Sequence, residues 1–170
     1  MRVGEFEKVS FEQFCEGVRK SQYGVYTDEE LREAYDNLKL PTRATSGSAG
    51  YDFKCPLEYR FCPKAVINIP TGIRCKIDEP GWFLSCFPRS GLGFKYRLRL
   101  ANSTAIIDQD YAYSDNEGHI FLKMCNEGYN ELTLMPGQGF AQGIFMPYGL
   151  TYDDDVTATR NGGMGSTDKK

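Results

Sequence analysis

A guanidinium, a hydroxyl and two glycines stand close together in the segment Pro88-Arg89-Ser90-Gly91-Leu92-Gly93. An Arg side chain offers phosphate oxygens a planar fork of donors, and the N–H groups of a turn can form an anion-binding nest. Glycine allows a ligand to approach the backbone closely. Because the same composition is typical of a solvated turn, this segment alone is only a weak indication of a phosphate site.

A pair of carboxylates follows an apolar run in Ile106-Ile107-Asp108-Gln109-Asp110-Tyr111. In extended backbone, Asp108 and Asp110 share a face while Gln109 points to the other side. Such a pair suits a base that activates water, or a metal, but it equally suits two turn residues that end a strand. Just before it, the segment 102–105 could offer backbone groups to a flat polar ring.

Two later segments carry polar groups of the same kind. Gln142 alternates with apolar residues in a predicted strand, so its side chain points either toward a ligand or simply into solvent. The final segment, 159–170, combines a cation, hydroxyls and glycines that suit a triphosphate. Its composition is also that of a flexible tail that cannot bury enough apolar surface to fold alone.

Composition excludes several other kinds of chemistry. The chain has 170 residues, a net charge of -3, six cysteines without a C-x-x-C pair, and a single histidine, His119. Zinc sites and histidine-based triads therefore lack ligands or bases, and the cysteines are expected to be reduced and mostly buried. The near-neutral charge argues against nucleic-acid binding. No apolar run approaches the ~18 residues of a membrane span, and no signal peptide is recognised, so we expect a cytoplasmic protein without membrane contact.

The elements that would position these groups differ along the chain. Capping-box sequences at Ser10 and Thr27 predict two short helices, the second over about 28–38, which together resemble an N-terminal appendage. From Pro41 onward, short apolar runs separated by turn residues predict a mostly β sandwich or barrel. The predicted strands are Ala65–Ile69, Gly72–Ile77, Trp82–Pro88, Ser103–Ile107, His119–Asn126, Leu132–Leu134 and Phe140–Pro147.

The four polar segments, together with Ala49-Gly50-Tyr51-Asp52-Phe53, have the order and approximate spacing of the five motifs of one enzyme family. Over about 49–167 the chain resembles the dUTP diphosphatase (dUTPase) family, trimeric type, with an added N-terminal helical extension. The resemblance implies a β-clip or distorted jelly-roll barrel. It divides the chain into a helical extension over 1–40, a β domain over 41–158 and a mobile C-terminal lid over 159–170.

The resemblance also implies a reaction and its residues. The family hydrolyses dUTP to dUMP and pyrophosphate with Mg²⁺, and Asp108 would act as the base for the water that attacks the α-phosphate. Mg²⁺ would be carried mainly by the triphosphate, and Asp52 would be structural or contact the water shell of the metal. A homotrimer is implied, with sites shared between chains. The implied substrate-binding residues are Arg89, Ser90, Gly91, Asn102, Ala105, Ile107, Tyr111, Gln142, Arg160, Met164, Gly165, Ser166 and Thr167.

Within this set the implied roles differ. Arg89, Ser90 and Gln142 would bind the phosphates, and Tyr111 would stack under the deoxyribose where a ribose 2′-hydroxyl would collide. Backbone groups of the hairpin over 102–106 would read uracil. In the tail, Arg160, Ser166 and Thr167 would clasp the γ-phosphate.

The chain departs from the family pattern in four places. Ala105 replaces a usual Gly, Gly139 replaces a common Arg, Met164 replaces a stacking Phe, and the segment 112–117 lengthens the turn after Asp-x-Asp-Tyr. Two alternatives remain. A related dCTP deaminase is disfavoured because Lys123 would occupy the position of its catalytic Glu. A regulatory nucleotide-binding module that signals through the N-terminal helices is disfavoured by the intact Asp108.

Overall fold

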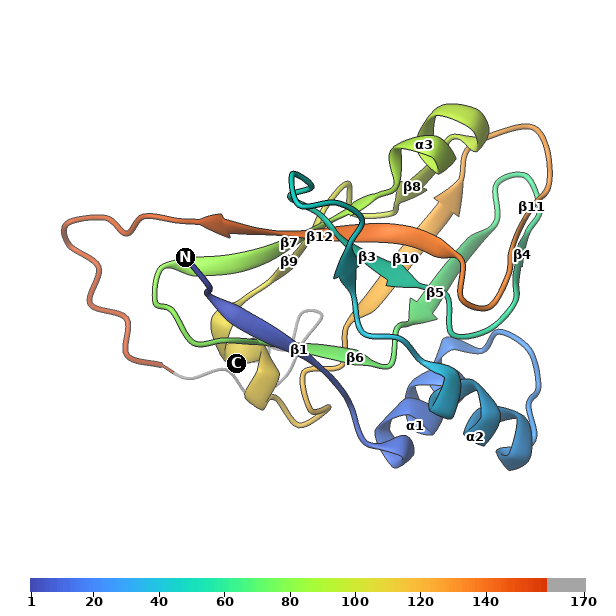
Figure 1. Cartoon of the computed structure of the whole chain (residues 1–170), viewed down its shortest axis with the longest axis horizontal. Helices are drawn as coiled ribbons and strands as arrows, with labels where there is room; N and C mark the ends of the chain where they lie inside the picture. The colour runs from blue at the N-terminus through green and yellow to red at the C-terminus, as the bar shows by residue number, and fades with distance from the viewer. Residues whose placement is uncertain (159–170) are drawn as a thin grey trace.

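The protein is mostly β-structure with helices near its N-terminus, as predicted; the computed structural model describes residues 1–158 (Figure 1). All strand pairs found in this part of the chain are antiparallel. The largest sheet has five strands in the order β2-β3-β12-β7-β9. Its members are β2 (Thr42–Arg43), β3 (Tyr51–Lys54), β12 (Gly139–Pro147), β7 (Trp82–Pro88) and β9 (Ala105–Ile107).

Three smaller sheets complete the β-structure of the described residues. One has the order β5-β10-β8, and the others pair β1 with β6 and β11 with β4. Their bounds are β1 (Gly4–Lys8), β4 (Tyr59–Phe61), β5 (Val66–Pro70), β6 (Ile73–Ile77), β8 (Leu98–Leu100), β10 (Phe121–Asn126) and β11 (Leu132–Leu134).

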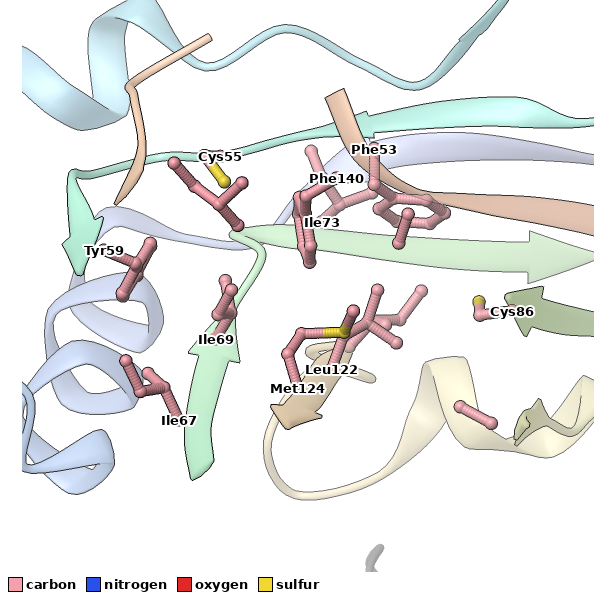
Figure 2. Close-up of a cluster of buried hydrophobic side chains, with 14 of the residues drawn as sticks. Phe53, Cys55, Tyr59, Ile67, Ile69, Ile73, Cys86, Leu122, Met124 and Phe140 are labelled. Carbon is pink, nitrogen blue, oxygen red and sulfur yellow. The ribbon is translucent and has the colours of Figure 1, made fainter. Parts of the chain in front are cut away.

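One continuous hydrophobic core joins these sheets. Phe53 and Phe140 come from the five-stranded sheet, Leu122 and Met124 come from β10, and all are essentially fully buried (Figure 2). Cysteines contribute to the same core. Burial raises the pKa of the Cys55 thiol to about 12, so this side chain packs as a small apolar group. All six cysteines are free thiols, and four are buried, as expected.

The two predicted helices begin at the predicted caps. Helix α1 spans Phe11–Ser21 and helix α2 spans Asp28–Asn37. The Thr27 cap is reciprocal, since its hydroxyl accepts from Glu30 N while the Glu30 carboxylate accepts from Thr27 N. The Ser10 cap is only half of a capping box. Its hydroxyl accepts from the N–H of the third helical residue, but the Ser10 N–H donates to the distant Glu117.

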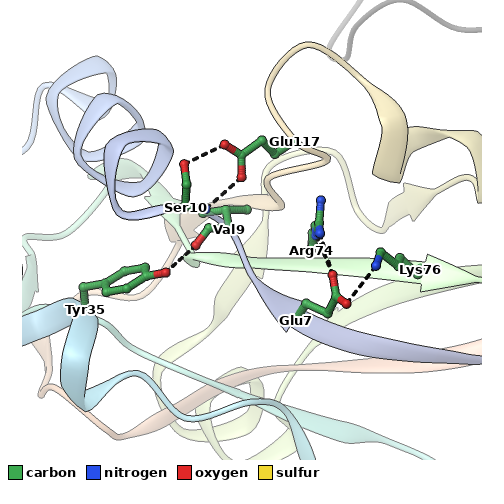
Figure 3. Close-up of polar contacts among 7 residues, drawn as sticks. All are labelled: Glu7, Val9, Ser10, Tyr35, Arg74, Lys76 and Glu117. Atoms are coloured by element: carbon green, nitrogen blue, oxygen red, sulfur yellow. Dashed lines mark hydrogen bonds and ion pairs between the residues drawn. The ribbon is translucent and has the colours of Figure 1, made fainter.

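The N-terminal segment shares the core of the β domain. Phe14 and Val18 of α1 and Leu31 of α2 belong to the same buried cluster as the strands. Strand β1, which the sequence did not indicate, pairs with β6 along its whole length. Glu7 of β1 forms ion pairs with Arg74 and Lys76 of β6 at 2.6 and 2.8 Å (Figure 3). The predicted division of the chain after residue 40 stays a prediction.

Two local predictions were wrong. The glycine-rich segment after β7 forms a short helix, α3 (Ser90–Tyr96), rather than a simple turn. The extended backbone expected through Asp110 ends at Asp108, because a 3-10 helix, η1, spans Gln109–Tyr113. The alternation that would put Asp108 and Asp110 on one face therefore stops between them. Asp108 is half-buried and Asp110 is exposed.

The described residues contain no helix long and apolar enough to cross a membrane.

Candidate active site

A hollow of about 300 Å³ lies beside the start of β3, the middle of β12 and the end of β7, three neighbouring strands. We call it the phosphate hollow, because it gathers three of the side chains predicted to bind phosphate, namely Arg89, Ser90 and Gln142. Antiparallel pairing explains their meeting, since Gln142 of β12 lies opposite Asp52 of β3 and Phe87 of β7. The full lining is Ala44, Ser48, Ala49, Gly50, Asp52, Arg89, Ser90, Gln142 and Ile144.

Two glycines make room for the polar side chains of this hollow. A Cβ on Gly50 would lie 2.4 Å from Oε1 of Gln142, and a Cβ on Gly139 would lie 2.7 Å from Nη1 of Arg89. Both distances are shorter than real Cβ atoms allow. The small residue at position 139 therefore lets the Arg89 side chain lie directly across the start of β12.

The Arg89 side chain is held in an ion pair. Its Nε lies 3.2 Å from Oδ1 of Asp52, and the Asp52 side chain is only 14% exposed against 42% for Arg89. Asp52 thus engages one edge of the guanidinium and leaves the remaining donors for an anion. The amide of Gln142 donates to the Pro88 carbonyl at 3.4 Å, a long hydrogen bond that a better acceptor would readily replace.

The segment 100–107 leads through a turn from β8 into β9. The hairpin expected over 102–106 does not form, because β8 pairs with β10 and β9 pairs with β7, so the two strands belong to different sheets. Ser103 adopts a positive φ of 67° at the tip, where its N–H donates to the Leu100 carbonyl. The Thr104 hydroxyl donates to the Cys86 carbonyl at 2.9 Å and lies 3.0 Å from the Ser85 hydroxyl. These contacts fasten the turn before β9 to β7. Of the predicted nucleoside residues here, Asn102 is exposed, while Ala105 and Ile107 are buried.

The segment Asp108–His119 follows β9, and we call it the nucleoside turn. Gln109 fixes its start, since its Nε2 donates to the Ile77 carbonyl at the end of β6. The Tyr111 side chain is buried, and its hydroxyl donates to the His119 carbonyl at 2.8 Å. The Gln109 contact could not be predicted from the sequence, because its partner lies on a strand 32 residues away.

His119 is a structural residue. Its side chain is fully buried, and Nε2 accepts from Gly72 N at 2.9 Å. The proton of the neutral ring is therefore assigned to Nδ1, which has no hydrogen-bond partner among the described residues. Burial lowers the pKa of His119 to about 4, against the opposing effect of the Glu117 carboxylate. A neutral, enclosed imidazole cannot serve as the catalytic base.

The phosphate hollow and Asp108 lie at opposite ends of β7. Ile107 pairs with Leu84, so Asp108 lies beside the start of β7, while Arg89 follows its end. At ~3.3 Å per residue, this register places the two residues about 20 Å apart along the strand. One chain thus brings the three side chains predicted to bind phosphate together, but it does not bring Asp108 to them.

The other predicted site residues are only partly placed. Gly91 is exposed in α3 and lines a second hollow of about 430 Å³ that also borders Arg89 and Ser90. Arg160, Met164, Gly165, Ser166 and Thr167 lie outside the described residues. Within the described part of the chain, no three His, Cys, Asp or Glu side chains gather as a metal site would require.

A family model described as dUTPase matches residues 36–168. The chain belongs to the dUTPase family. The deoxyuridine 5'-triphosphate nucleotidohydrolases of Enterobacter sp. (strain 638) and Escherichia coli O9:H4 (strain HS) are each 36% identical to it over 138 residues. These alignments cover 77% of this chain and 88% of each relative.

Solved structures agree with the dUTPase assignment. The crystal structure of the Streptococcus mutans dUTPase matches with a TM-score of 0.63 and 33% identity, covering 86% of this chain and 97% of that one. The dUTPase from phage phi11 of S. aureus matches with a TM-score of 0.60, covering 72% and 92% of the two chains. At 19% identity, the phage enzyme supports the fold alone.

Proposed function

We propose that this dUTPase, which hydrolyses dUTP to dUMP and pyrophosphate, uses Asp108 as the general base for the water that attacks the α-phosphate. Asp108 is a half-buried carboxylate on a turn that Gln109 fastens to β6. A carboxylate is ionised at neutral pH and can take a proton from water within hydrogen-bond reach. The chain's single histidine is enclosed in the core, which supports a carboxylate base.

Arg89, Ser90 and Gln142 bind the phosphate chain in the phosphate hollow. They supply a guanidinium and a hydroxyl from the segment that follows β7 and an amide from the neighbouring strand β12. Because these donors are already positioned, they can stabilise the charge that develops on phosphate oxygens during displacement. Asp52 keeps the Arg89 fork oriented through its ion pair.

Mg²⁺ suits this donor set as an ion carried by the substrate. Among the residues that line the phosphate hollow, Asp52 is the one carboxylate, and it already engages Arg89. Phosphate oxygens would therefore hold the metal, with Asp52 contacting its water shell. When bound, Mg²⁺ neutralises the triphosphate and keeps it in line for displacement. A phage phi11 dUTPase variant is described as coordinating a structural Mg(II) ion.

Tyr111 selects the sugar, and the turn between β8 and β9 reads the base. The buried Tyr111 ring has its hydroxyl fixed by the His119 carbonyl, so it forms a firm wall that a ribose 2′-hydroxyl would strike. Backbone groups of 102–107 would recognise uracil, with Asn102 at the open tip and Ala105 in the paired strand. In the tail, Arg160, Ser166 and Thr167 would clasp the γ-phosphate, and Met164 with Gly165 would cover the base.

The working enzyme is a homotrimer in which each site combines residues from different chains. The single observation that carries this is the separation of Asp108 from Arg89 by about 20 Å along β7. That separation is far longer than a triphosphate, yet both residues must contact one. A rotationally symmetric assembly resolves the conflict, because Asp108 of one chain then faces the phosphate hollow of another.

Mixing two inactive variants tests this arrangement. Asp108→Asn and Arg89→Ala should each be nearly inactive alone. When the two variants are co-assembled in equal amounts, about a quarter of the shared sites contain both native residues. Pyrophosphate release from dUTP should therefore return to about that fraction of the unmutated rate. A mixture that stays as inactive as its components, with mixed assembly verified by mass, would mean that each site lies within one chain. Wild-type protein that releases no pyrophosphate would overturn the activity itself.

A further inference from the structure

The lengthened segment 112–117 contacts the Tyr111 hydroxyl. Asn116 Nδ2 donates to that oxygen at 2.9 Å, while the hydroxyl itself donates to the His119 carbonyl at 2.8 Å. Asn116 also makes two backbone contacts in this turn, since its Oδ1 accepts from Gly118 N and its carbonyl accepts from His119 N. The Asn116 side chain therefore fixes both the phenol oxygen and the bend of the backbone beneath it.

The shape of this bend is strongly determined. Glu117 and Gly118 both have positive φ angles, 57° and 69°, so the chain reverses within two residues. A Cβ at Gly118 would lie 2.5 Å from Cα of Ala112, which leaves room only for glycine. Because the bend closes directly onto the residue after Tyr111, the aromatic ring and the bend form one packed unit.

The N-terminal strand and helix hold the outer side of the bend. The Glu117 carboxylate accepts from Ser10 N at 2.7 Å and from the Ser10 hydroxyl at 2.6 Å (Figure 3). Burial raises the pKa of Glu117, but the hydrogen bonds from Ser10 outweigh it, so the pKa lies below its usual value and the group is ionised at neutral pH. His119 adds a second attachment, because Gly17 of α1 lies directly against its ring.

We propose that Asn116 is a positioning residue that sets the height of the Tyr111 ring and thereby the discrimination between deoxyribose and ribose. A steric wall rejects a hydroxyl only if it cannot yield, and displacements of about 0.5 Å are enough to spoil such a geometry. The hydrogen bond from Asn116 keeps the Tyr111 ring from moving. The contact between Glu117 and Ser10 in turn ties the turn that carries Asn116 to the N-terminal segment. This inference rests on the proposed role of Tyr111 as the sugar wall.

The test compares kcat/KM for dUTP and for UTP in variants at position 116. Asn116→Ala removes the donor, and Asn116→Asp replaces it with an acceptor of the same shape. Each should reduce the dUTP:UTP ratio by about three- to tenfold, the range for one lost hydrogen bond. The loss should come mainly from faster UTP turnover rather than slower dUTP turnover. Asn130→Asp, in an exposed loop, is the matched control and should leave the ratio unchanged.

A double-mutant cycle separates positioning from general loosening of the turn. Tyr111→Phe removes the hydroxyl that Asn116 contacts, so Asn116→Ala added to it should change the ratio by less than about twofold. An equally large effect in both backgrounds would overturn the proposal, because Asn116 would then act independently of that hydroxyl.

Tyr111→Ala distinguishes the role of the Tyr111 ring from the role of Asn116. If Tyr111→Ala leaves the dUTP:UTP ratio unchanged, the sugar wall itself is misassigned. If Tyr111→Ala lowers the ratio but neither variant at position 116 does, the wall stands and the positioning role of Asn116 is wrong.

Discussion

The phosphate hollow and the nucleoside turn differ in what holds them in place. The hollow lies on β3, β12 and β7, adjacent strands within the five-stranded sheet, and its side chains contact one another. The turn follows β9, the edge strand of that sheet. Remote groups hold the turn, since Gln109 bonds to the end of β6 and Glu117 bonds to Ser10.

This difference indicates where each half of the site is sensitive to change. Strand register and small residues determine the hollow, so substitutions within its own segments should alter it. The turn depends on contacts spanning as many as 107 residues of sequence, so substitutions in β1, α1 or β6 should reach it from a distance. One sheet thus carries, at opposite ends of β7, a phosphate hollow that its own segments specify and a nucleoside turn that tertiary packing specifies.

The largest expected effect is on kcat and comes from a substitution in the nucleoside turn. Substrate affinity, which we assign to the phosphate hollow, should not change. Asp108→Asn should lower kcat by about 10²-fold or more, the scale of a lost general base, while dUTP affinity is retained. Steady-state pyrophosphate release and calorimetric titration with a non-hydrolysable dUTP analogue measure the two quantities. Asp115→Asn, an exposed substitution in the same turn, is the control. Full activity of Asp108→Asn would remove this residue from the mechanism.

Burial of His119, at the end of the nucleoside turn, makes the stability of the protein depend on pH. The folded-state pKa of about 4 lies below the usual 6.5, so the unfolded chain binds more protons between these values and stability rises with pH across this window. The free energy of unfolding should be about 2 kcal/mol lower at pH 5 than at pH 7. Urea titrations at fixed protein concentration measure it.

A glutamine variant isolates the histidine contribution. In His119→Gln, the amide oxygen can still accept from Gly72 N, but the side chain does not titrate. The difference between pH 5 and pH 7 should then largely disappear. The lowered pKa values of Glu7 and Glu117 affect stability only at lower pH, below about 4.5, where those carboxylates become protonated. A variant with the wild-type pH dependence would show that His119 is not the responsible group.

The sequence predicted features that depend on neighbouring residues better than features that depend on tertiary contacts. Cap residues at Ser10 and Thr27 correctly predicted both helix starts, because capping depends on neighbours three residues away. Most strands of the core were also predicted from their apolar runs. Strand β1 was missed, since its short, charged sequence is held extended by pairing with β6. Helix α3 was missed because two glycines disfavour a helix locally.

In the candidate site, too, features set by nearby residues were predicted and features set by distant partners were not. Arg89, Ser90 and Gln142 were predicted together and the hollow brings them together. The roles of Gln109 and Glu117 could not be predicted, because each depends on a partner that only the folded chain supplies. The added length of 112–117 was the one sequence feature that pointed to this turn. It showed that the turn departs from the family pattern, but not which contacts the extra residues make.

A smaller effect tests whether the hollow is specified locally. Gly139→Ala places a methyl group where the Arg89 guanidinium lies, at 2.7 Å from Nη1, so the side chain must move away from the phosphates. We expect kcat/KM for dUTP to fall by up to about tenfold, as for one weakened charge-assisted hydrogen bond. Gly47→Ala, where the Cβ meets nothing within 4 Å, is the matched control. Equal kinetics for both variants would mean that Arg89 tolerates displacement.

The smallest expected effect tests whether the turn depends on the N-terminal segment. Ser10→Ala and Thr27→Ala each remove a helix N-cap and should each lower the free energy of unfolding by about 1 kcal/mol. Only Ser10 also donates to Glu117, so only Ser10→Ala should lower the dUTP:UTP ratio of kcat/KM. The reduction should be small, about threefold or less, because the Ser10 N–H still holds one carboxylate oxygen. If the two variants reduce the ratio equally, lost stability explains the effect. If only Ser10→Ala reduces it, the N-terminal helix supports the sugar-selecting turn directly.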